Sequence, residues 1–339
     1  MPNEERDATE HPGGVLLGDR TYSLADQQAF ADFCGDRNPI HLDALYARRT
    51  ISGEIVVHGV NAILWALDLL VARGFDAPAR LKATFRKPIF LNERVDCRLH
   101  EARNILSIWR DKARLVDIAF QPGAVPAAGK HTLTASQEKK PAVVSEADLA
   151  DAEPRPLHLR GRTAHAPALF PAVCTALGDA RVCDLAATSE IVGMQIPGLH
   201  SLYLSLKTSF VSAGAVTPFF KVESFDRRFR IVNLEVKTTS LEAQLSALLR
   251  PPPAKIPGLA ELEAGIVPGE FNQVRALIVG GSRGLGEATA KIIACGGGSV
   301  TITYNVGADE AKQLVDEISG AGGKARMARV DVLSERSVA

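Results

Sequence analysis

An acid and an imidazole lie five residues apart in the stretch FADFCGDRNPIHLD, which begins at Phe30. Asp36 is followed by Asn38, Pro39 and His41, directly after an apolar pattern typical of a short helix. Proline fixes its own φ angle and can hold a turn in which both side chains point the same way. A carboxylate and an imidazole that converge on one water can share the removal and return of its proton. The stretch predicts either such an acid–base site or a helix-capping loop with a structural histidine.

A second feature is the dipeptide His58–Gly59, which opens the long apolar pattern HGVNAILWALDLLVARG and predicts a helix that stops at Gly74. The first N–H groups of a helix have no intrahelical acceptor, and the helix dipole favours negative charge beside them. The N–H of Gly59 therefore suits an oxygen that gains negative charge, such as a thioester carbonyl turning into an enolate. Each of these residues alone is more often structural, but their joint spacing favours an active site.

These residues, within FCGDRNPIHLDALYA and ISGEIVVHGVNAI, resemble the MaoC-like family of (R)-specific 2-enoyl-CoA hydratases over about the first 130 residues. The resemblance implies a hotdog fold, in which a sheet wraps a long central helix. It implies that Asp36 and His41 activate the water that adds to a trans-2-enoyl thioester, giving an (R)-3-hydroxyacyl product. It also implies that the Gly59 N–H fills the oxyanion hole and that Asn38 braces the loop. His58 either belongs to the site or only packs.

A glycine-rich loop in ALIVGGSRGLGEATA follows a predicted strand and opens a predicted helix, with the spacing Gly-x-x-x-Gly-x-Gly. Glycines let the main chain approach a pyrophosphate, whose charge suits a helix N-terminus. The loop resembles that of the short-chain dehydrogenases/reductases, although Val279 stands where that family usually has threonine. The resemblance implies that NADP(H) is bound by loop and strand-end residues: Gly280, Ser282, Arg283, Gly284, Leu285, Gly286, Asp331 and Val332.

The reductase part looks NADPH-dependent and incomplete. Arg283, and the lack of an acid at the end of the next strand, TITYNVG, favour NADPH, because an acid there would repel a 2′-phosphate. The family's Tyr-x-x-x-Lys catalytic residues do not follow the loop. We therefore expect either a fragment of a longer fusion protein or a vestigial reductase, and no reduction by these 339 residues.

Two proline-bounded stretches, QEKKPAVVSEADLADAEPRP and RPPPAKIPGLAELEAGIVPGE, divide the chain. They predict a catalytic hotdog at 1–140, a second hotdog at 155–250, a Pro-rich linker at 251–271 and the N-terminal half of a Rossmann domain at 272–339. The second hotdog repeats the helix-then-strands order without the Asp-x-Asn-Pro-x-His motif, so we expect it to be non-catalytic, to complete the sheet and to help form the acyl pocket, with His200 structural. The predicted fold is an α+β double hotdog, two long helices wrapped by antiparallel sheet, followed by a partial α/β Rossmann-type unit.

Composition narrows the class of protein. The 39 basic and 39 acidic residues cancel, which argues against a nucleic-acid or membrane-surface partner. Five cysteines without a CxxC pair predict reduced thiols, no disulfide framework and no metal site. The polar N-terminus is unlike a signal peptide and no apolar run is long enough to span a bilayer, so we expect a cytoplasmic protein. A single hotdog exposes a sheet edge, so pairing, including a homodimer, is expected.

The sequence therefore predicts an (R)-specific 2-enoyl-thioester hydratase, or 3-hydroxyacyl dehydratase, acting on acyl-CoA or acyl carrier protein thioesters without a cofactor of its own. It is fused to an incomplete NADPH-dependent 3-oxoacyl reductase, whose (R)-3-hydroxyacyl product is what a dehydratase consumes. Two alternatives stay open: a non-catalytic module that binds or docks acyl thioesters, and a hotdog thioesterase.

Overall fold

The computed structural model describes five segments of the chain, residues 13–125, 140–157, 165–212, 216–252 and 256–338. The chain forms two compact units, Met1–Pro251 and Pro252–Ala339. The polar N-terminus up to residue 12 and parts of both predicted linkers lie outside the described segments. Within those segments, no helix has the length and apolar character needed to cross a membrane.

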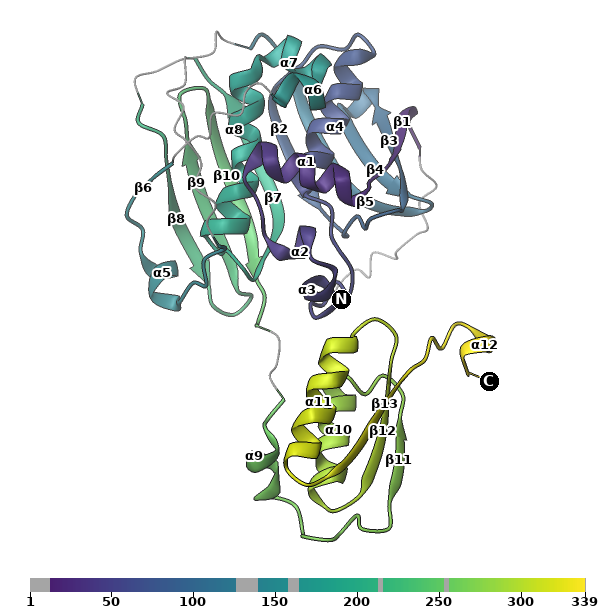
Figure 1. The fold of residues 1–339 in the computed structure, drawn as a ribbon. Coiled ribbons are helices and arrows are strands. Elements are labelled where there is room, and N and C mark those ends of the chain that lie inside the picture. The colour runs from purple at the N-terminus through teal and green to yellow at the C-terminus, as the bar shows by residue number, and fades with distance from the viewer. Residues whose placement is uncertain (1–12, 126–139, 158–164, 213–215, 253–255, 339) are drawn as a thin grey trace, which may run out of the picture. The chain divides into compact units, whose positions relative to one another are not determined.

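The first unit is built on one ten-stranded antiparallel sheet with the order β1-β3-β4-β5-β2-β7-β10-β9-β8-β6 (Figure 1). Its first half has five strands: β1 (Val15–Thr21), β2 (Pro78–Phe85), β3 (Arg94–His100), β4 (Ile105–Arg110) and β5 (Ala113–Pro122). Its second half also has five: β6 (Arg155–Pro156), β7 (Ser201–Phe210), β8 (Phe219–Asp226), β9 (Ile231–Lys237) and β10 (Leu241–Leu249). From the centre outward both halves follow the same order, which is the repeat that the sequence predicts.

The two halves meet at the antiparallel pair β2–β7. Residues of β2 from Arg80 to Thr84 pair with residues of β7 from Ser209 to Ser205. The sheet is therefore continuous across the two halves. The edge that a single hotdog would expose is covered within the chain, so a homodimer is not needed to complete the sheet.

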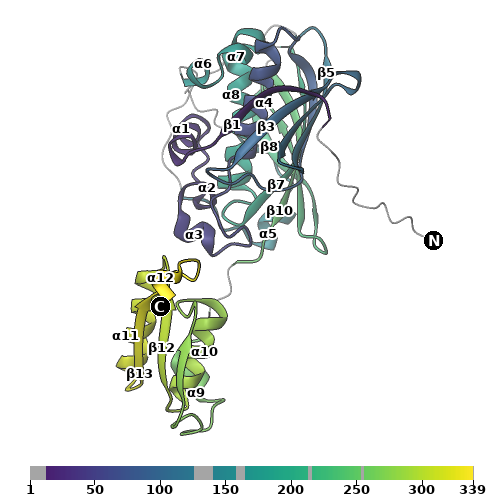
Figure 2. The same ribbon diagram turned by 90° about the vertical axis from the view of Figure 1, so that its right-hand side faces the viewer.

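Helices cover one face of this sheet (Figures 1 and 2). The first half supplies α1 (Leu24–Cys34), α2 (Pro39–Leu42), α3 (Ala44–Arg48) and α4 (Gly59–Ala72). The second half supplies α5 (Glu146–Ala150), α6 (Ala166–Leu169), α7 (Pro171–Leu177), α8 (Asp179–Glu190) and a π-helical turn, η3 (Ile191–Gln195). The two long central helices, α4 and α8, confirm the double hotdog.

The helix α4 is apolar around most of its circumference and is largely buried, as expected for a helix in the middle of a core. Leu64, Leu67 and Leu70 are fully buried. The helix begins at Gly59, and the chain turns away at Gly74, whose φ is +86°. Both ends agree with the sequence prediction, and at Gly74 a glycine accepts the left-handed conformation without strain.

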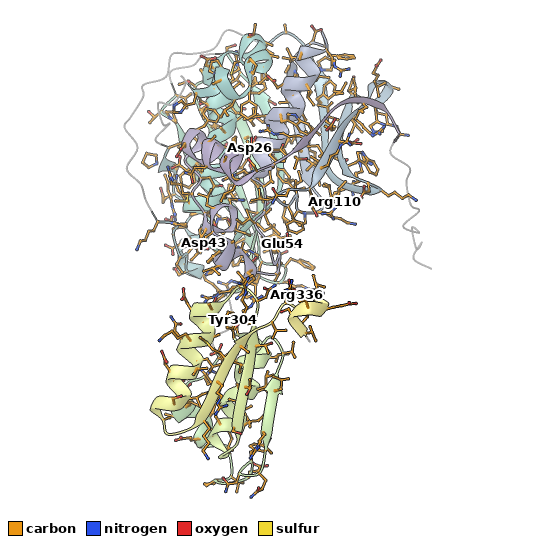
Figure 3. All side chains as sticks on the ribbon, turned by 45° about the vertical axis from the view of Figure 1, so that its right-hand side comes forward. Asp26, Asp43, Glu54, Arg110, Tyr304 and Arg336 are labelled. Carbon is orange, nitrogen blue, oxygen red and sulfur yellow. The ribbon has the colours of Figure 1, made fainter. Side chains whose placement is uncertain are left out.

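The helix α1 ends immediately before the acid of the predicted site. Ser23 caps its N-terminus and forms a capping box with Asp26, which is labelled in Figure 3. Gly35 ends the helix in a left-handed conformation, with a φ of +85°. The main chain therefore leaves the helix at a fixed angle one residue before Asp36.

The second unit has three parallel strands, in the order β11 (Arg275–Ile278), β12 (Ser299–Tyr304) and β13 (Lys324–Arg329). They alternate with α10 (Gly284–Cys295) and α11 (Ala308–Gly320), and α12 (Glu335–Val338) follows. This is the partial Rossmann-type unit that the sequence predicts. The predicted linker 251–271 contains a further helix, α9 (Leu259–Glu263), and Leu259 packs in the hydrophobic core of this unit. That segment is thus more than a spacer.

Candidate active site

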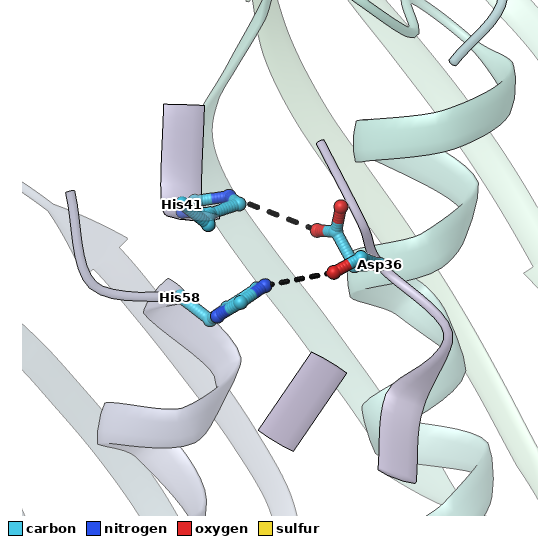
Figure 4. Close-up of side chains that lie close together, drawn as sticks. All are labelled: Asp36, His41 and His58. Atoms are coloured by element: carbon cyan, nitrogen blue, oxygen red, sulfur yellow. Dashed lines mark hydrogen bonds and ion pairs between the residues drawn. The ribbon is translucent and has the colours of Figure 1, made fainter. Parts of the chain in front are cut away.

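The loop between α1 and α2 carries Asp36, and α2 itself carries His41 (Figure 4). Asn38 caps α2, because its side-chain oxygen accepts the N–H of Ile40 at 3.2 Å. The N–H of Asn38 in turn donates to Oδ1 of Asp36 at 3.1 Å. Local hydrogen bonds therefore fix both the short helix that carries His41 and the carboxylate that precedes it.

The side-chain amide of Asn38 joins this loop to the second half of the unit. Its Nδ2 donates to the carbonyl oxygen of Gly193 at 2.8 Å and lies 3.1 and 3.3 Å from those of Gly198 and Leu199. Asn38 is fully buried. This is the geometry expected of a residue that braces the loop, and it braces the loop against the other half.

His41 is oriented by its own second ring nitrogen. Nδ1 lies 2.6 Å from the carbonyl oxygen of Val56, and a carbonyl only accepts, so Nδ1 carries the hydrogen. Nε2 of a neutral ring then keeps its lone pair, and it lies 3.8 Å from Oδ2 of Asp36. Two proton acceptors thus face each other at a distance that one water molecule can bridge.

Asp36 is 2% exposed, and its environment acts on its pKa in two directions. Burial dominates and raises the pKa of Asp36 above the ordinary value of 3.8. The charge that His41 carries when it is protonated, the hydroxyl of Ser189 and the N–H of Asn38 oppose this rise. The carboxylate is therefore a stronger base than an exposed aspartate.

His58 stacks on His41, with ring centroids 3.9 Å apart and an interplanar angle of 27°. Its Nδ1 lies 2.6 Å from Oε1 of Gln27, and its Nε2 lies 3.0 Å from the main-chain oxygen of Asp36. Burial, and then the proximity of His41, lower the pKa of His58 well below its ordinary value, so the ring is neutral. Both nitrogens are engaged with the surrounding protein, which supports a packing role beneath His41.

The three side chains Asp36, His41 and His58 also place possible metal-ligand atoms within 4.8 Å of one another. A metal-bound imidazole must offer a lone pair. A neutral His58 keeps one lone pair, but whichever nitrogen carries it faces a protein oxygen, either Oε1 of Gln27 at 2.6 Å or the main-chain oxygen of Asp36 at 3.0 Å. Nδ1 of His41 donates to Val56. No ion fits between a His58 nitrogen and an oxygen 3.0 Å away or nearer, so these three side chains do not form a complete set of metal ligands.

Gly59 opens α4 at the wall of a cavity of about 310 Å³, which Asp36 and His41 also line. As the first residue of the helix it has an N–H without an intrahelical acceptor. The ring of Phe85 packs over it so closely that a Cβ at Gly59 would lie 2.6 Å from a ring carbon. Further apolar side chains line the cavity, among them Ile40, Val57, Val116, Val192 and Leu204. The structure thus brings together Asp36, Asn38, His41 and Gly59, the four predicted catalytic residues.

The second half contributes residues to the site that sequence reasoning misses. Ser189, at the end of α8, donates its hydroxyl to Oδ2 of Asp36 at 2.7 Å. Gly193 and Tyr203 line the cavity, and the ring of Tyr203 lies 5.2 Å from that of Phe85. The stretch TSEIVG, which contains Ser189 and Gly193, has no motif that predicts these contacts. The contacts join residues more than 110 positions apart in the sequence. His200 is not among the residues that line the cavity.

The glycine-rich loop of the second unit has the main-chain shape of a phosphate-binding loop. Gly280 and Gly284 have φ angles of +72° and +58°, and α10 begins at Gly284. A Cβ at Gly286 would lie 2.5 Å from the oxygen of Gly280, so only glycine fits there. These observations fit a pyrophosphate held by main-chain N–H groups.

The other predicted cofactor residues occupy the positions expected from the sequence. Ser282 is buried in the loop, whereas Leu285 is exposed on the first turn of α10. Asp331 and Val332 lie two and three residues beyond the end of β13, and Oδ1 of Asp331 accepts the N–H of Leu333 at 3.0 Å. Their role toward a nucleotide stays a prediction.

The fold and the site define a double hotdog with an Asp–His pair at the head of a central helix. Comparison with known proteins agrees: residues 8–113 match the family model described as MaoC like domain. Residues 274–339 match the model described as short chain dehydrogenase. The chain thus carries a MaoC-like dehydratase domain and a short-chain dehydrogenase segment.

Individual relatives cover parts of the chain. The Escherichia coli (strain K12) protein named Uncharacterized oxidoreductase YgfF is 40% identical over 63 residues, which are 19% of this chain and 26% of that protein. A solved structure titled MaoC-like dehydratase is 13% identical, with a TM-score of 0.45, over 68% of this chain and 96% of that one. The (R)-hydratase from A. caviae is 24% identical, with a TM-score of 0.25, over 31% of this chain and 92% of that one. The chain therefore spans about a quarter of the curated relative that it matches.

Proposed function

We propose that the first unit is an enoyl-thioester hydratase, or 3-hydroxyacyl dehydratase. The observation that carries the proposal is the placement of Asp36 Oδ2 and His41 Nε2 3.8 Å apart, on the wall of a cavity that Gly59 also lines. A water oxygen about 2.8 Å from each atom can donate one hydrogen to each of them. Such a water is poised to lose a proton as it attacks a bound enoyl group.

In the proposed hydration, the water oxygen bonds to C3 of the 2-enoyl thioester while His41 and Asp36 take up its proton. The electron pair of the double bond moves onto the thioester oxygen as an enolate. The N–H of Gly59 donates to that oxygen, where the N-terminus of α4 favours the charge. A proton returned to C2 completes the 3-hydroxyacyl product, and dehydration is the reverse of these steps.

The apolar cavity wall supports an acyl chain as the bound group. We assign the (R) configuration of the product, and coenzyme A or an acyl carrier protein as the carrier, on the resemblance of the loop 36–41 and of Gly59 to the hydratase family. The hydratase reaction needs no cofactor.

For the second unit we propose NADP(H) as the ligand of the glycine-rich loop, as part of a 3-oxoacyl reductase. The three-stranded sheet described here carries the loop but no Tyr-x-x-x-Lys.

Hydration of crotonyl-CoA tests the proposal. The reaction is followed by the loss of absorbance of the conjugated enoyl thioester. We expect Asp36→Asn and His41→Ala each to lower kcat by about 10²–10⁴-fold, the usual scale for a positioned acid or base. The double variant should be little worse than the worse single one, because the two groups act as a unit.

Matched controls are Asp76→Asn and His165→Ala, which change exposed residues. They should retain wild-type turnover. Near-normal turnover of either Asp36→Asn or His41→Ala would refute the assignment of these two residues as the acid–base pair. Release of free thiol without hydration would indicate a thioesterase, and binding without turnover would indicate an acyl-binding module.

A further inference from the structure

The carboxylate of Asp36 is held from two sides, and one of them belongs to the second half of the unit. Asn38 donates its N–H to Oδ1 at 3.1 Å. Ser189 donates its hydroxyl to Oδ2 at 2.7 Å, and Oδ2 is the oxygen that faces Nε2 of His41. Ser189 is 3% exposed, so water competes little for this bond.

The main chain around Ser189 is shaped to this contact. The π-helical turn η3 follows α8 and brings Gly193 against Asp36. A Cβ at Gly193 would overlap both carboxylate oxygens, so no other residue fits there without displacing them. Such π-helical turns are frequent at functional sites. The same turn offers the carbonyl oxygen of Gly193 to the amide of Asn38 at 2.8 Å, which closes a ring of contacts around the acid.

We propose that Ser189 is a positioning residue of the active site, supplied by the half that lacks the Asp-x-Asn-Pro-x-His motif, and that its hydroxyl aims Oδ2 of Asp36 at the water shared with His41. The proposal rests on the hydratase function proposed above. It changes the role of the second half, which supplies part of the acid–base apparatus as well as the wall of the acyl pocket.

A hydroxyl that donates to a carboxylate stabilises the charged form over the protonated form. Loss of the Ser189 hydroxyl leaves burial less opposed, so Asp36 would hold its proton to higher pH. Loss of a residue with only a packing role would not change the pKa of Asp36. The pH profile therefore separates positioning from packing.

The chain offers a matched control in the same half. Ser240 is fully buried and donates to Oδ2 of Asp184 at 2.7 Å, so it makes the same kind of bond. Neither Ser240 nor Asp184 lines the cavity. Ser240→Ala therefore removes an equivalent serine–carboxylate bond without touching the site.

The experiment measures kcat and kcat/KM for crotonyl-CoA hydration from pH 4 to 9 in wild type, Ser189→Ala, Ser189→Thr and Ser240→Ala. We expect Ser189→Ala to lower kcat about tenfold and to shift the acidic limb of the profile upward by about one pH unit, the scale of one hydrogen bond to a charged group. Ser189→Thr keeps the hydroxyl, so the acidic limb of its pH profile should lie where it does in the wild type. Ser240→Ala should leave both kcat and the position of the acidic limb unchanged. An unshifted limb in Ser189→Ala would overturn the proposal.

A second readout does not need activity. The difference in melting temperature between the wild type and Asp36→Asn, followed against pH, reports the folded-state pKa of Asp36. We expect the midpoint of this difference to move to higher pH when both proteins also carry Ser189→Ala. If the wild type shows no hydration, the proposed function fails, yet this shift still establishes the Ser189 contact. If hydration is seen and the midpoint does not move, only the role of Ser189 is refuted.

Discussion

At the scale of single residues, the site places a carboxylate where a carboxylate is costly. Asp36 is buried, and the pKa of its side chain is raised mainly by that burial. The folded protein therefore binds the Asp36 proton more tightly than the unfolded chain does. The sign of the effect follows: stability from this group is fully present below pH 3.8 and is lost as the pH rises through the raised folded-state pKa.

This sign gives a prediction for Asp36→Asn. Asparagine resembles the protonated acid and needs no charge in the core, so the variant should unfold at a higher temperature than the wild type at pH 7. The difference should vanish below pH 3.8, where the wild-type acid is protonated in both states. Thermal unfolding followed by circular dichroism at several pH values measures it. A variant that is less stable at pH 7 would contradict the assigned direction of the pKa shift.

At the scale of elements, the site depends on where α4 begins. Gly59 opens the helix at the cavity wall, and a Cβ at this position would lie 2.6 Å from a ring carbon of Phe85. A methyl group there must displace either the ring or the first turn of the helix. Small displacements of groups that bind a transition state have large effects on rate.

We therefore expect Gly59→Ala to lower kcat by at least about tenfold, since misplacement by about 1 Å can cost 10²-fold. The second substitution Phe85→Leu in the same chain removes the ring and should restore part of the loss. Gly320→Ala serves as a control, because a Cβ there meets no atom within 4 Å. Unchanged turnover in Gly59→Ala would mean that the start of α4 does not contact the reacting group.

A second prediction at this scale concerns His200, which lies between η3 and β7. It is half-buried and does not line the cavity. His200→Ala should keep kcat within a few-fold of wild type in the crotonyl-CoA assay. Collapse of turnover in a variant that still unfolds cooperatively would place a catalytic role in that segment.

Local patterns predict the elements well and the contacts between halves poorly. The cap at Ser23, the start of α4 at Gly59 and the turn at Gly74 follow from residue types with a fixed local preference. The proximity of Asp36 and His41 follows because they are five residues apart, in the loop before α2 and in α2 itself. The bond from Ser189 to Asp36 does not follow, because it depends on how α8 lies across the sheet, and serine at a helix end has several ordinary roles. The helix α9 is hidden likewise, since prolines surround it.

At the scale of the whole molecule, the two units have separate hydrophobic cores. The core of the first includes residues from Leu17 to Leu249, and that of the second includes residues from Leu259 to Ile318. On the second unit's sheet, Leu277 of β11 is 68% exposed. A nucleotide site on a Rossmann sheet is normally closed by strands beyond the first three. The three described strands therefore offer the phosphate loop without that closure.

Deletion of residues 252–339 should leave crotonyl-CoA hydration intact, because none of the residues lining the cavity belongs to them. The 339-residue chain should bind NADPH weakly in a fluorescence titration. It should not oxidise NADPH when a 3-oxoacyl thioester is added, which is measured by the NADPH absorbance at about 340 nm. The deletion variant's unfolding transition is the control for its folding. Measurable reduction would contradict the assignment of an incomplete reductase, and loss of hydration would show that the second unit supports the first.

The strands β2 and β7 join the two halves of the sheet within one polypeptide, so the two halves can change separately during evolution. In a symmetric homodimer every substitution appears twice, once behind each active site. Here the two halves are parts of one polypeptide, and a substitution at Val192 or Leu204 alters one wall of one cavity. Sequence drift in the second half can therefore change which acyl chains fit, while the segment that carries Asp36 and His41 is left unaltered.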